Sequence, residues 1–277
     1  MDLGLKNRTA LVCGSSKGIG KTIALFLAKE GVNIALCSRN ANALEETRQT
    51  LVAETGVNVI GIVADLSSRQ DIEKILQTTQ KQLGAIDILI NNTGTPPAGN
   101  LLELTEENWE SAYQMMLMRV IRLTKGVIPQ MKEKNWGRIV NIEATSIAQP
   151  RDDFLLSSTL RAGVAAFSQA IAANLATHNI LIHTVCPGVI ATESTLAIAD
   201  KVATAEGISR ETARKRLINS VPMERMGTPE EIAALVTCLV SDRLSYITGH
   251  LFNVDGGRHR VFPNSPYAKT SQNQTTD

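Results

Sequence analysis

The stretch that decides the fold is residues 13–20, Cys13-Gly14-Ser15-Ser16-Lys17-Gly18-Ile19-Gly20. It follows a short apolar run and leads directly into a segment with Ile23, Phe26 and Leu27 at helical spacing. The three glycines let a backbone turn tightly and approach a pyrophosphate, and the N-terminus of the next helix supplies unpaired N–H groups. An ordinary glycine-rich turn is the alternative, but the flanking strand and helix disfavour it. The stretch therefore predicts a dinucleotide-binding turn.

The same pattern of a β-branched run followed by helical spacing recurs along the chain. Seven runs are short enough to be buried strands: residues 9–13, 33–37, 57–63, 87–90, 138–142, 180–185 and 250–254. Alternating strands and helices form right-handed βαβ crossovers, which produce a parallel sheet with helices on both faces. We therefore predict an α/β fold, a Rossmann-type doubly wound parallel sheet, as a single domain over residues 1–257.

Two segments depart from the alternation. Residues 194–227 are polar and helix-prone, and they follow the sixth predicted strand, where a doubly wound sheet has its ligand crevice. We predict that they form a helical substrate lid. Residues 258–277 are polar and aperiodic, which favours a loose tail or an arm that contacts another subunit.

The composition excludes several classes of protein. The chain has 277 residues, 28 Lys and Arg against 27 Asp and Glu, and 43% hydrophobic residues, which disfavours both disorder and nucleic-acid binding. It has no apolar run of membrane-spanning length and no signal-peptide pattern at its start, so we expect a cytoplasmic protein. The four cysteines are far apart and lack metal-ligand spacing, so we expect them to be reduced and buried, with no metal site.

The end of the second predicted strand indicates which dinucleotide fits. NAD-specific sites place an Asp or Glu there to bind the ribose hydroxyls. This chain has Ser38-Arg39 at that point, and Lys17 lies in the glycine turn. A forked Arg and a Lys suit a 2′-phosphate. We therefore expect NADP(H) rather than NAD(H); the alternative is that both are ordinary surface charges.

Taken together, these motifs resemble those of the short-chain dehydrogenase/reductases, especially the 3-oxoacyl-carrier-protein reductases, over residues 5–257. Further matching segments are Asp65-Leu66, Asn91-Asn92-Thr93-Gly94, residues 137–142, residues 187–192 and Asp255-Gly256-Gly257. The resemblance implies homodimers or homotetramers that assemble through the fourth and fifth helices. It also implies a set of cofactor-binding residues: Gly14, Ser16, Lys17, Gly18, Ile19, Gly20, Ser38, Arg39, Asp65, Leu66, Asn92, Gly94, Arg161, Pro187, Gly188, Ile190 and Thr192.

The catalytic positions of that family are replaced in this chain. The family reduces carbonyls with a Tyr, a Lys four residues later, a Ser on the fifth strand and an Asn in the fourth helix. Matching residues 161–163, Arg-Ala-Gly, to the family's Lys-Ala-Gly puts Ser157 in the Tyr position and Arg161 in the Lys position. The same alignment places Ala144 at the Ser position and Met116 at the Asn position.

These replacements change the chemistry. A Ser hydroxyl is a far weaker acid than a phenol of pKa about 10, and an Arg keeps its proton at neutral pH. The usual proton relay is therefore absent, but Arg161 can still bind the ribose, hold a carboxylate substrate or stabilise a developing oxyanion. We assign the catalytic role to Ser157 and Arg161.

Other polar residues near these positions bear on the missing acid. The 2,4-dienoyl-CoA reductases, relatives that also have Ser in the Tyr position, use a Tyr at the place where this chain has Ser146, so the loss is not compensated in that way. Tyr113 is expected on a similar helix face to Met116, where a packing role is favoured. Glu143 would serve as a general acid if desolvation raised its pKa, but strand alternation puts it on the opposite face from Ala144, which favours a surface carboxylate.

The sequence therefore favours an NADP(H)-dependent oxidoreductase with a non-standard active site, acting on a carbonyl or an activated alkene. An NADP(H)-binding protein without turnover, serving as a regulatory or partner subunit, is the alternative, because the glycine turn is kept while four catalytic positions are replaced. Non-redox chemistry like that of the halohydrin dehalogenases fits less well, since those proteins keep Ser and Tyr and give up the glycine loop.

Overall fold

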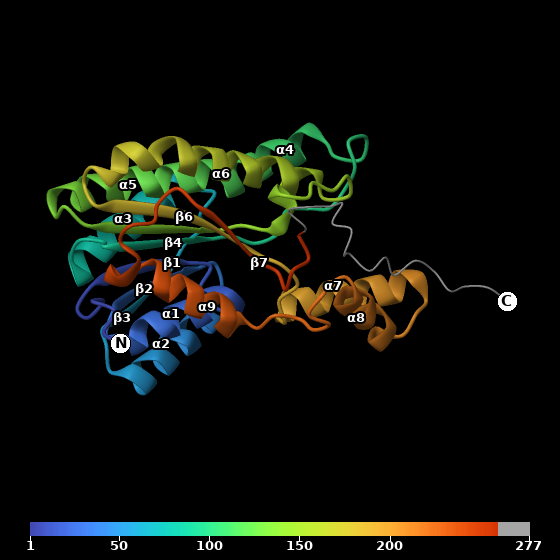
Figure 1. Ribbon diagram of the computed structural model, residues 1–277, viewed down its shortest axis with the longest axis horizontal. Helices are drawn as coiled ribbons and strands as arrows, with labels where there is room; N and C mark the ends of the chain where they lie inside the picture. The colour runs from blue at the N-terminus through green and yellow to red at the C-terminus, as the bar shows by residue number, and fades with distance from the viewer. Residues whose placement is uncertain (260–277) are drawn as a thin grey trace.

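The computed structural model of the protein describes residues 1–259, and its centre is a seven-stranded sheet. Every neighbouring pair of strands is parallel, in the order β3-β2-β1-β4-β5-β6-β7 (Figure 1). The strands are β1 (Thr9–Cys13), β2 (Asn33–Ser38), β3 (Val59–Val63), β4 (Ile88–Asn92), β5 (Gly137–Ile142), β6 (Ile180–Pro187) and β7 (Leu251–Val254). The predicted Rossmann-type doubly wound fold is confirmed.

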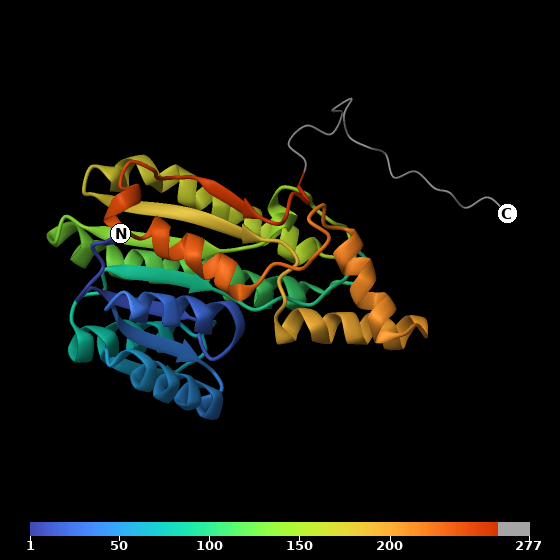
Figure 2. The ribbon, with the colours of Figure 1, turned by 60° about the horizontal axis from the view of Figure 1, so that its bottom comes forward.

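Helices cover both faces of this sheet (Figures 1 and 2). One layer consists of α1 (Gly18–Lys29), α2 (Ala41–Thr55) and α9 (Pro229–Leu239), and the other of α3 (Arg69–Leu83), α5 (Arg119–Glu133) and α6 (Leu155–Ala176). Successive residues of β1 alternate between the two cores: Ala10 and Val12 belong to the first, and Leu11 and Cys13 to the second. Burial on both faces explains why the strands read as continuous apolar runs.

The order of strands reverses between β1 and β4. β1 pairs with β2 on one side and with β4 on the other, so the connections leave in opposite directions from this point. A ligand crevice opens at the carboxyl ends of strands where such a reversal occurs. The glycine turn follows β1 and Asn92 ends β4, so both lie at this crevice.

Between β4 and α5 the chain forms α4 (Glu106–Ala112) and a π-helix (Tyr113–Met118) that the sequence did not predict. Hydrogen bonds from i to i+5 widen a π-turn. Met116 is buried and Tyr113 is 37% exposed, yet both lie near Trp109 and Leu160. That Tyr113 and Met116 project from a similar face stays a prediction.

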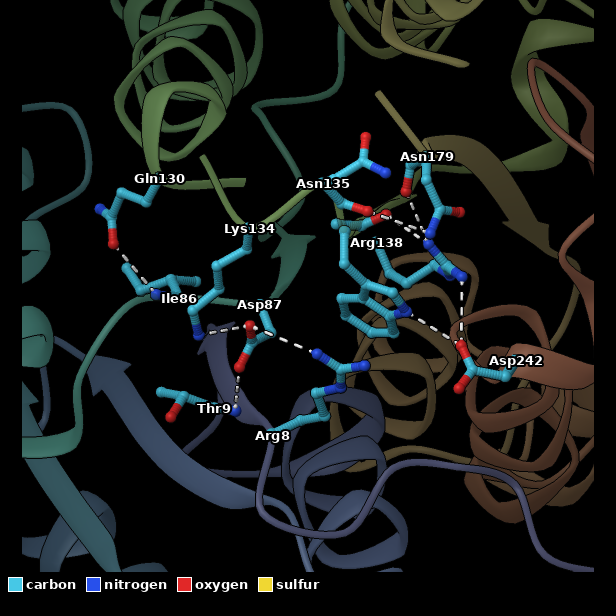
Figure 3. Close-up of polar contacts among 12 residues, drawn as sticks. Arg8, Thr9, Ile86, Asp87, Gln130, Lys134, Asn135, Arg138, Asn179 and Asp242 are labelled. Atoms are coloured by element: carbon cyan, nitrogen blue, oxygen red, sulfur yellow. Dashed lines mark hydrogen bonds and ion pairs between the residues drawn. The ribbon is translucent and has the colours of Figure 1, made fainter. Parts of the chain in front are cut away.

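A cluster of charged residues surrounds Trp136 at the opposite edge of the sheet, where the strands begin (Figure 3). The guanidinium carbons of Arg8 and Arg138 lie 3.8 and 4.2 Å from the Trp136 ring centroid. Asp242 accepts hydrogen bonds from Trp136 Nε1 at 2.9 Å and from Arg138 Nη2 at 3.4 Å. The Asp87 carboxylate accepts one from Lys134 at 2.7 Å. This cluster joins the start of β1, β4 and β5 to the turn that contains Asp242.

The predicted lid forms two helices, α7 (Glu193–Glu206) and α8 (Arg210–Asn219), which extend away from the body of the sheet (Figures 1 and 2). They bury a small cluster of their own, made by Ala199, Ala203 and Ala213. Closure over a substrate stays a prediction. Of the predicted tail, residues 258–277, only residues 258 and 259 are described, and the rest lies outside the described residues.

Two remaining expectations concern the membrane and the cysteines. No helix within residues 1–259 combines the length and the apolar character that crossing a membrane requires.

Cys13, Cys37 and Cys186 are buried as predicted, but Cys238 is exposed. The prediction fails for Cys238 because α9 turns Val236 and Leu239 toward the core and leaves residue 238 on its solvent side.

Candidate active site

The glycine turn packs too closely against its surroundings to accept side chains at Gly14 and Gly20. Gly14 and Gly18 have positive φ angles of 58° and 55°, which favour glycine. A Cβ at Gly14 would lie 2.9 Å from the Asn92 side-chain nitrogen, and one at Gly20 would overlap the Gly14 carbonyl. No side chain caps the N-terminus of α1, so its first N–H groups are free to bind phosphate oxygens. The turn fits a pyrophosphate.

The end of β2 adds polar and basic groups beside this turn. Ser38 Oγ donates a hydrogen bond to Ser16 Oγ at 2.8 Å, which ties the strand end to the turn. Arg39 and Lys17 are both exposed, and Lys17 Nζ lies 3.7 Å from a Glu193 carboxylate oxygen. Both basic side chains are therefore free to move toward a phosphate group.

The end of β3 positions the next predicted residues. Asp65 Oδ1 accepts hydrogen bonds from Ser67 N and Ser67 Oγ, both at 2.9 Å. These bonds, led by the one from the backbone N–H, hold the pKa of the Asp65 carboxyl below its usual range. Leu66 packs against the core under α3. The Asp65 carboxylate is thus held in place at the carboxyl end of β3.

The end of β4 is held by buried amides. Asn92 Nδ2 donates to the Gly14 carbonyl at 3.2 Å, which joins β4 to the glycine turn. Asn91 Nδ2 donates to Asn141 Oδ1 at 2.8 Å, and Asn141 in turn donates to Ser168 Oγ on α6 at 2.8 Å. These bonds link β4, β5 and α6 just below the crevice.

The segment after β6 closes the same crevice from the other side. A Cβ at Gly188 would lie 2.7 Å from Asp255, so only glycine fits the close approach of these two segments. Ile190 forms an isolated parallel bridge with Gly227, and Thr192 caps α7 through its bond from Thr195 N at 3.2 Å. A Cβ at Gly18 would lie 3.7 Å from the Thr192 methyl group, so this segment reaches the glycine turn.

Ser157 and Arg161 lie one turn apart on α6, and they contact each other. Arg161 Nε donates to Ser157 Oγ at 3.0 Å, and the Ser146 hydroxyl lies 3.4 Å from the Ser157 hydroxyl. Arg161 Nη2 donates to the Gly94 carbonyl at 3.3 Å, which places the guanidinium at the end of β4. Both side chains are buried. The structure therefore brings the two predicted catalytic residues together with Gly94.

Glu143 is part of this group, and its predicted place on the surface is wrong. Its side chain is 1% exposed, and its Oε2 accepts a hydrogen bond from Arg161 Nη1 at 2.8 Å. Alternation along β5 failed as a guide because both faces of this sheet are covered by helices. Burial raises the pKa of the Glu143 carboxyl, while the charges of Arg161 and Arg119 oppose that shift.

Arg119 is a buried residue of this site that the sequence reasoning missed. It starts α5, and its Nη1 donates to the Asn92 carbonyl at 3.0 Å. Its Nε and Nη2 have no hydrogen-bond partner within residues 1–259. Burial lowers its pKa, and the nearby Cys13 and Glu143 oppose that shift. A signal was present, since this is a lone charge within the apolar stretch Met-Met-Leu-Met-Arg-Val-Ile at residues 115–121.

Tyr113 does not join the group. It lines a separate surface hollow with Trp109, Leu160 and three acidic residues of α4. It also has no hydrogen bond to Ser157 among the described residues. Within residues 1–259 no group of three or more His, Cys, Asp and Glu side chains is arranged to hold a metal ion.

Comparison with known proteins identifies relatives along nearly the whole chain. The family described as "Enoyl-(Acyl carrier protein) reductase" matches residues 14–259. NADPH-dependent reductase BacG of Bacillus subtilis (strain 168) is 32% identical over 254 residues, which cover 91% of this chain and 98% of that protein. The 3-oxoacyl-(acyl-carrier-protein) reductase FabG of Vibrio cholerae is 31% identical over 259 residues, which cover 94% of this chain and 100% of the relative.

A solved structure agrees with these matches. The L-sorbose reductase of Gluconobacter frateurii, complexed with NADPH and L-sorbose, superimposes with a TM-score of 0.91 at 28% identity and covers 95% of this chain and 100% of its own. The likeness therefore extends over the sheet, its helices and the glycine turn. This protein belongs to the short-chain dehydrogenase/reductase family.

Proposed function

We propose that this protein is an NADP(H)-dependent reductase of the short-chain type with a non-standard active site, acting on a carbonyl or an activated alkene. The observation that carries the proposal is the contact between Arg161, Ser157 and the Gly94 carbonyl at the mouth of the crevice. Its relatives support the cofactor, since BacG is an NADPH-dependent reductase and the L-sorbose reductase structure contains NADPH.

The residues of the crevice fit this cofactor. The side-chain-free turn and the uncapped start of α1 suit the pyrophosphate, and Arg39 and Lys17 suit a 2′-phosphate. The segment 187–192 reaches back to the glycine turn and would hold the nicotinamide end. When bound, NADP(H) supplies the hydride.

Ser157 and Arg161 have distinct tasks in this proposal. Because Ser157 Oγ accepts a bond from Arg161 Nε, its own O–H proton remains free to donate to a substrate oxygen. The fixed positive charge of Arg161 stabilises negative charge that develops on that oxygen. Neither residue delivers the final proton at neutral pH by its own acidity, so that proton comes from water or through the ribose hydroxyl.

A two-step experiment tests the proposal. NADPH fluorescence is titrated first, and NADPH consumption is then followed with a panel of ketones, aldehydes and enones. We expect binding of NADPH, turnover of at least one substrate class, and loss of turnover in Arg161→Met with weaker but measurable NADPH binding, because Arg161 is also expected to contact the ribose. Binding without turnover of any substrate would favour the alternative function, a regulatory or partner subunit. Absence of binding would refute both.

A further inference from the structure

A buried carboxylate lies between two buried arginines at the end of β5. Glu143, Arg119 and Arg161 are all nearly inaccessible to solvent. Counting backbone and side chain together, the three residues are 6%, 2% and 5% exposed. With all three ionised, the group carries a net positive charge. Ion pairs buried in this way are costly to desolvate and are weak evidence for stability alone. A role in orienting a functional group is therefore worth testing.

The contacts of Arg161 show what Glu143 contributes. Each of the three guanidinium nitrogens has its own acceptor: Nε binds Ser157, Nη1 binds Glu143 and Nη2 binds the Gly94 carbonyl. Ser157 lies on the same helix as Arg161, so it moves with that helix and cannot fix it from outside. Two acceptors on other elements bind Arg161. They are the neutral Gly94 carbonyl, 3.3 Å from Nη2, and the Glu143 carboxylate, 2.8 Å from Nη1.

We propose that Glu143 is a positioning residue whose carboxylate holds the Arg161 guanidinium in the plane in which Nε faces Ser157. A planar, forked side chain is needed for this, because an ammonium group has no fixed plane to orient. The catalytic consequence rests on the proposed function, but the orientation itself does not. Glu143 therefore acts through Arg161 and not on the substrate.

Arg119 is the second charge on which this arrangement depends. Its Nη1 is committed to the Asn92 carbonyl, and its remaining nitrogens have no partner within residues 1–259. It therefore favours the ionised Glu143 through space, without competing for the oxygen that binds Arg161. Replacing Arg119 should therefore disturb the orientation of the Arg161 guanidinium less than removing the Glu143 carboxylate does.

The orientation can be measured without any substrate. In protein labelled with ¹⁵N-arginine, the Nε–Hε signal of Arg161 is assigned by its loss in Arg161→Lys, and its exchange with water is measured. We expect slow exchange in the parent protein and at least ~10-fold faster exchange in Glu143→Gln, because the side chain loses its strongest external anchor. Asp242→Asn, which weakens the pair with Arg138 at the other edge of the sheet, is the matched control and should leave the Arg161 signal unchanged.

Glu143→Gln leaves two buried arginines without a counter-ion, so it can fail to fold. In that case the double variant Arg119→Met/Glu143→Gln is used, because it keeps the net charge of the group. The Arg161 Nε–Hε proton should exchange with water faster in this variant by the same factor. An unchanged Arg161 signal in a folded protein that lacks the Glu143 carboxylate would overturn the proposal.

A second readout separates positioning from stability. With a substrate found in the reductase assay, the same variants should lower kcat by ~10-fold or more, while the Kd for NADPH, to which Arg161 is also expected to contribute, rises by a clearly smaller factor. Glu143→Asp should recover part of kcat. Loss of NADPH binding in parallel with kcat would contradict positioning. If the protein has no turnover, the exchange measurement still decides the inference, and only the proposed function fails.

Discussion

The side chain of Arg39 extends into solvent at the end of β2, next to the Ser38 hydroxyl that binds Ser16. A hydrogen bond to a charged group contributes about 1.5–3 kcal/mol. Arg39→Leu should therefore raise the Kd for NADPH by about 10- to 100-fold, measured by NADPH fluorescence, and leave the Kd for NADH unchanged. The matched control is Arg69→Leu, an exposed arginine of α3 whose partner is Glu73. An equal loss of affinity for both dinucleotides would contradict the assignment of Arg39 to the 2′-phosphate.

His183 on β6 predicts a pH effect on stability. Its ring is buried with no hydrogen-bond partner within residues 1–259, and burial lowers its pKa to about 4, assisted by His250. In the unfolded chain the pKa is about 6.5, so the unfolded state binds the proton first as the pH falls. The free energy of unfolding should therefore decrease from pH 6.5 downward, by about 3 kcal/mol at pH 4 from this residue.

Urea denaturation at several pH values, compared with His183→Phe, measures that contribution. Phe keeps an aromatic ring against Phe252 but does not titrate. The difference in unfolding free energy between the two proteins should change between pH 6.5 and 4 and be constant above pH 7. A constant difference over the whole range would contradict a depressed His183 pKa.

Single residues of the site show why pattern reasoning was incomplete. One aligned tripeptide singles out both Ser157 and Arg161, and the structure places them in contact, while their catalytic role stays a prediction. Glu143 was misjudged and Arg119 overlooked because each is buried only through the pairing of β5, α5 and α6, which are far apart in sequence. A charged side chain is buried only where another part of the chain supplies a partner for it. The spacing of apolar residues within one segment does not reveal that partner.

At the scale of elements, the strands were the most predictable part. Each of the seven apolar runs corresponds to one strand of the structure. A strand that is buried on both faces is apolar along its whole length, so its own sequence identifies it. The π-helix at Tyr113–Met118 was not predictable, because a single widened turn leaves the apolar spacing of the segment almost unchanged. Within it Met116 is buried, in a small apolar cluster with Leu156 and Leu160 of α6.

The turn that carries Asp242 stabilises the edge where the strands begin. Asp242 accepts bonds from Trp136 and from Arg138, whose pKa burial lowers to about 10. Asp242→Ala removes the carboxylate oxygen that accepts both bonds and should lower the free energy of unfolding in urea by about 1–3 kcal/mol. Glu73→Ala, which breaks only an exposed pair on α3, should cost less than about 1 kcal/mol. Equal effects of the two substitutions would show that the Trp136 cluster does not stabilise this edge.

At the scale of the whole molecule, the helical pair α7 and α8 is a separate packing unit. Its buried cluster shares no residue with the two cores on either face of the sheet. Within the pair, Asp200 lies 3.2 Å from Arg214 and 3.6 Å from Arg210. Segments with few apolar contacts to the main body open at lower free energy than the core. Within residues 1–257, the first cuts by trypsin should therefore fall within residues 194–227.

NADPH should slow these cuts, because Thr192 both caps α7 and lies beside Gly18 of the glycine turn. Ligand bound across that junction restrains the start of α7 and lowers the population of the open form. We expect several-fold slower cleavage of residues 194–227 with saturating NADPH, measured by mass spectrometry of the fragments. Asp200→Asn should speed cleavage in the absence of NADPH, since it removes the charge that pairs with α8. Cleavage that begins elsewhere within residues 1–257, or that NADPH leaves unchanged, would mean that these helices are not a lid coupled to the cofactor.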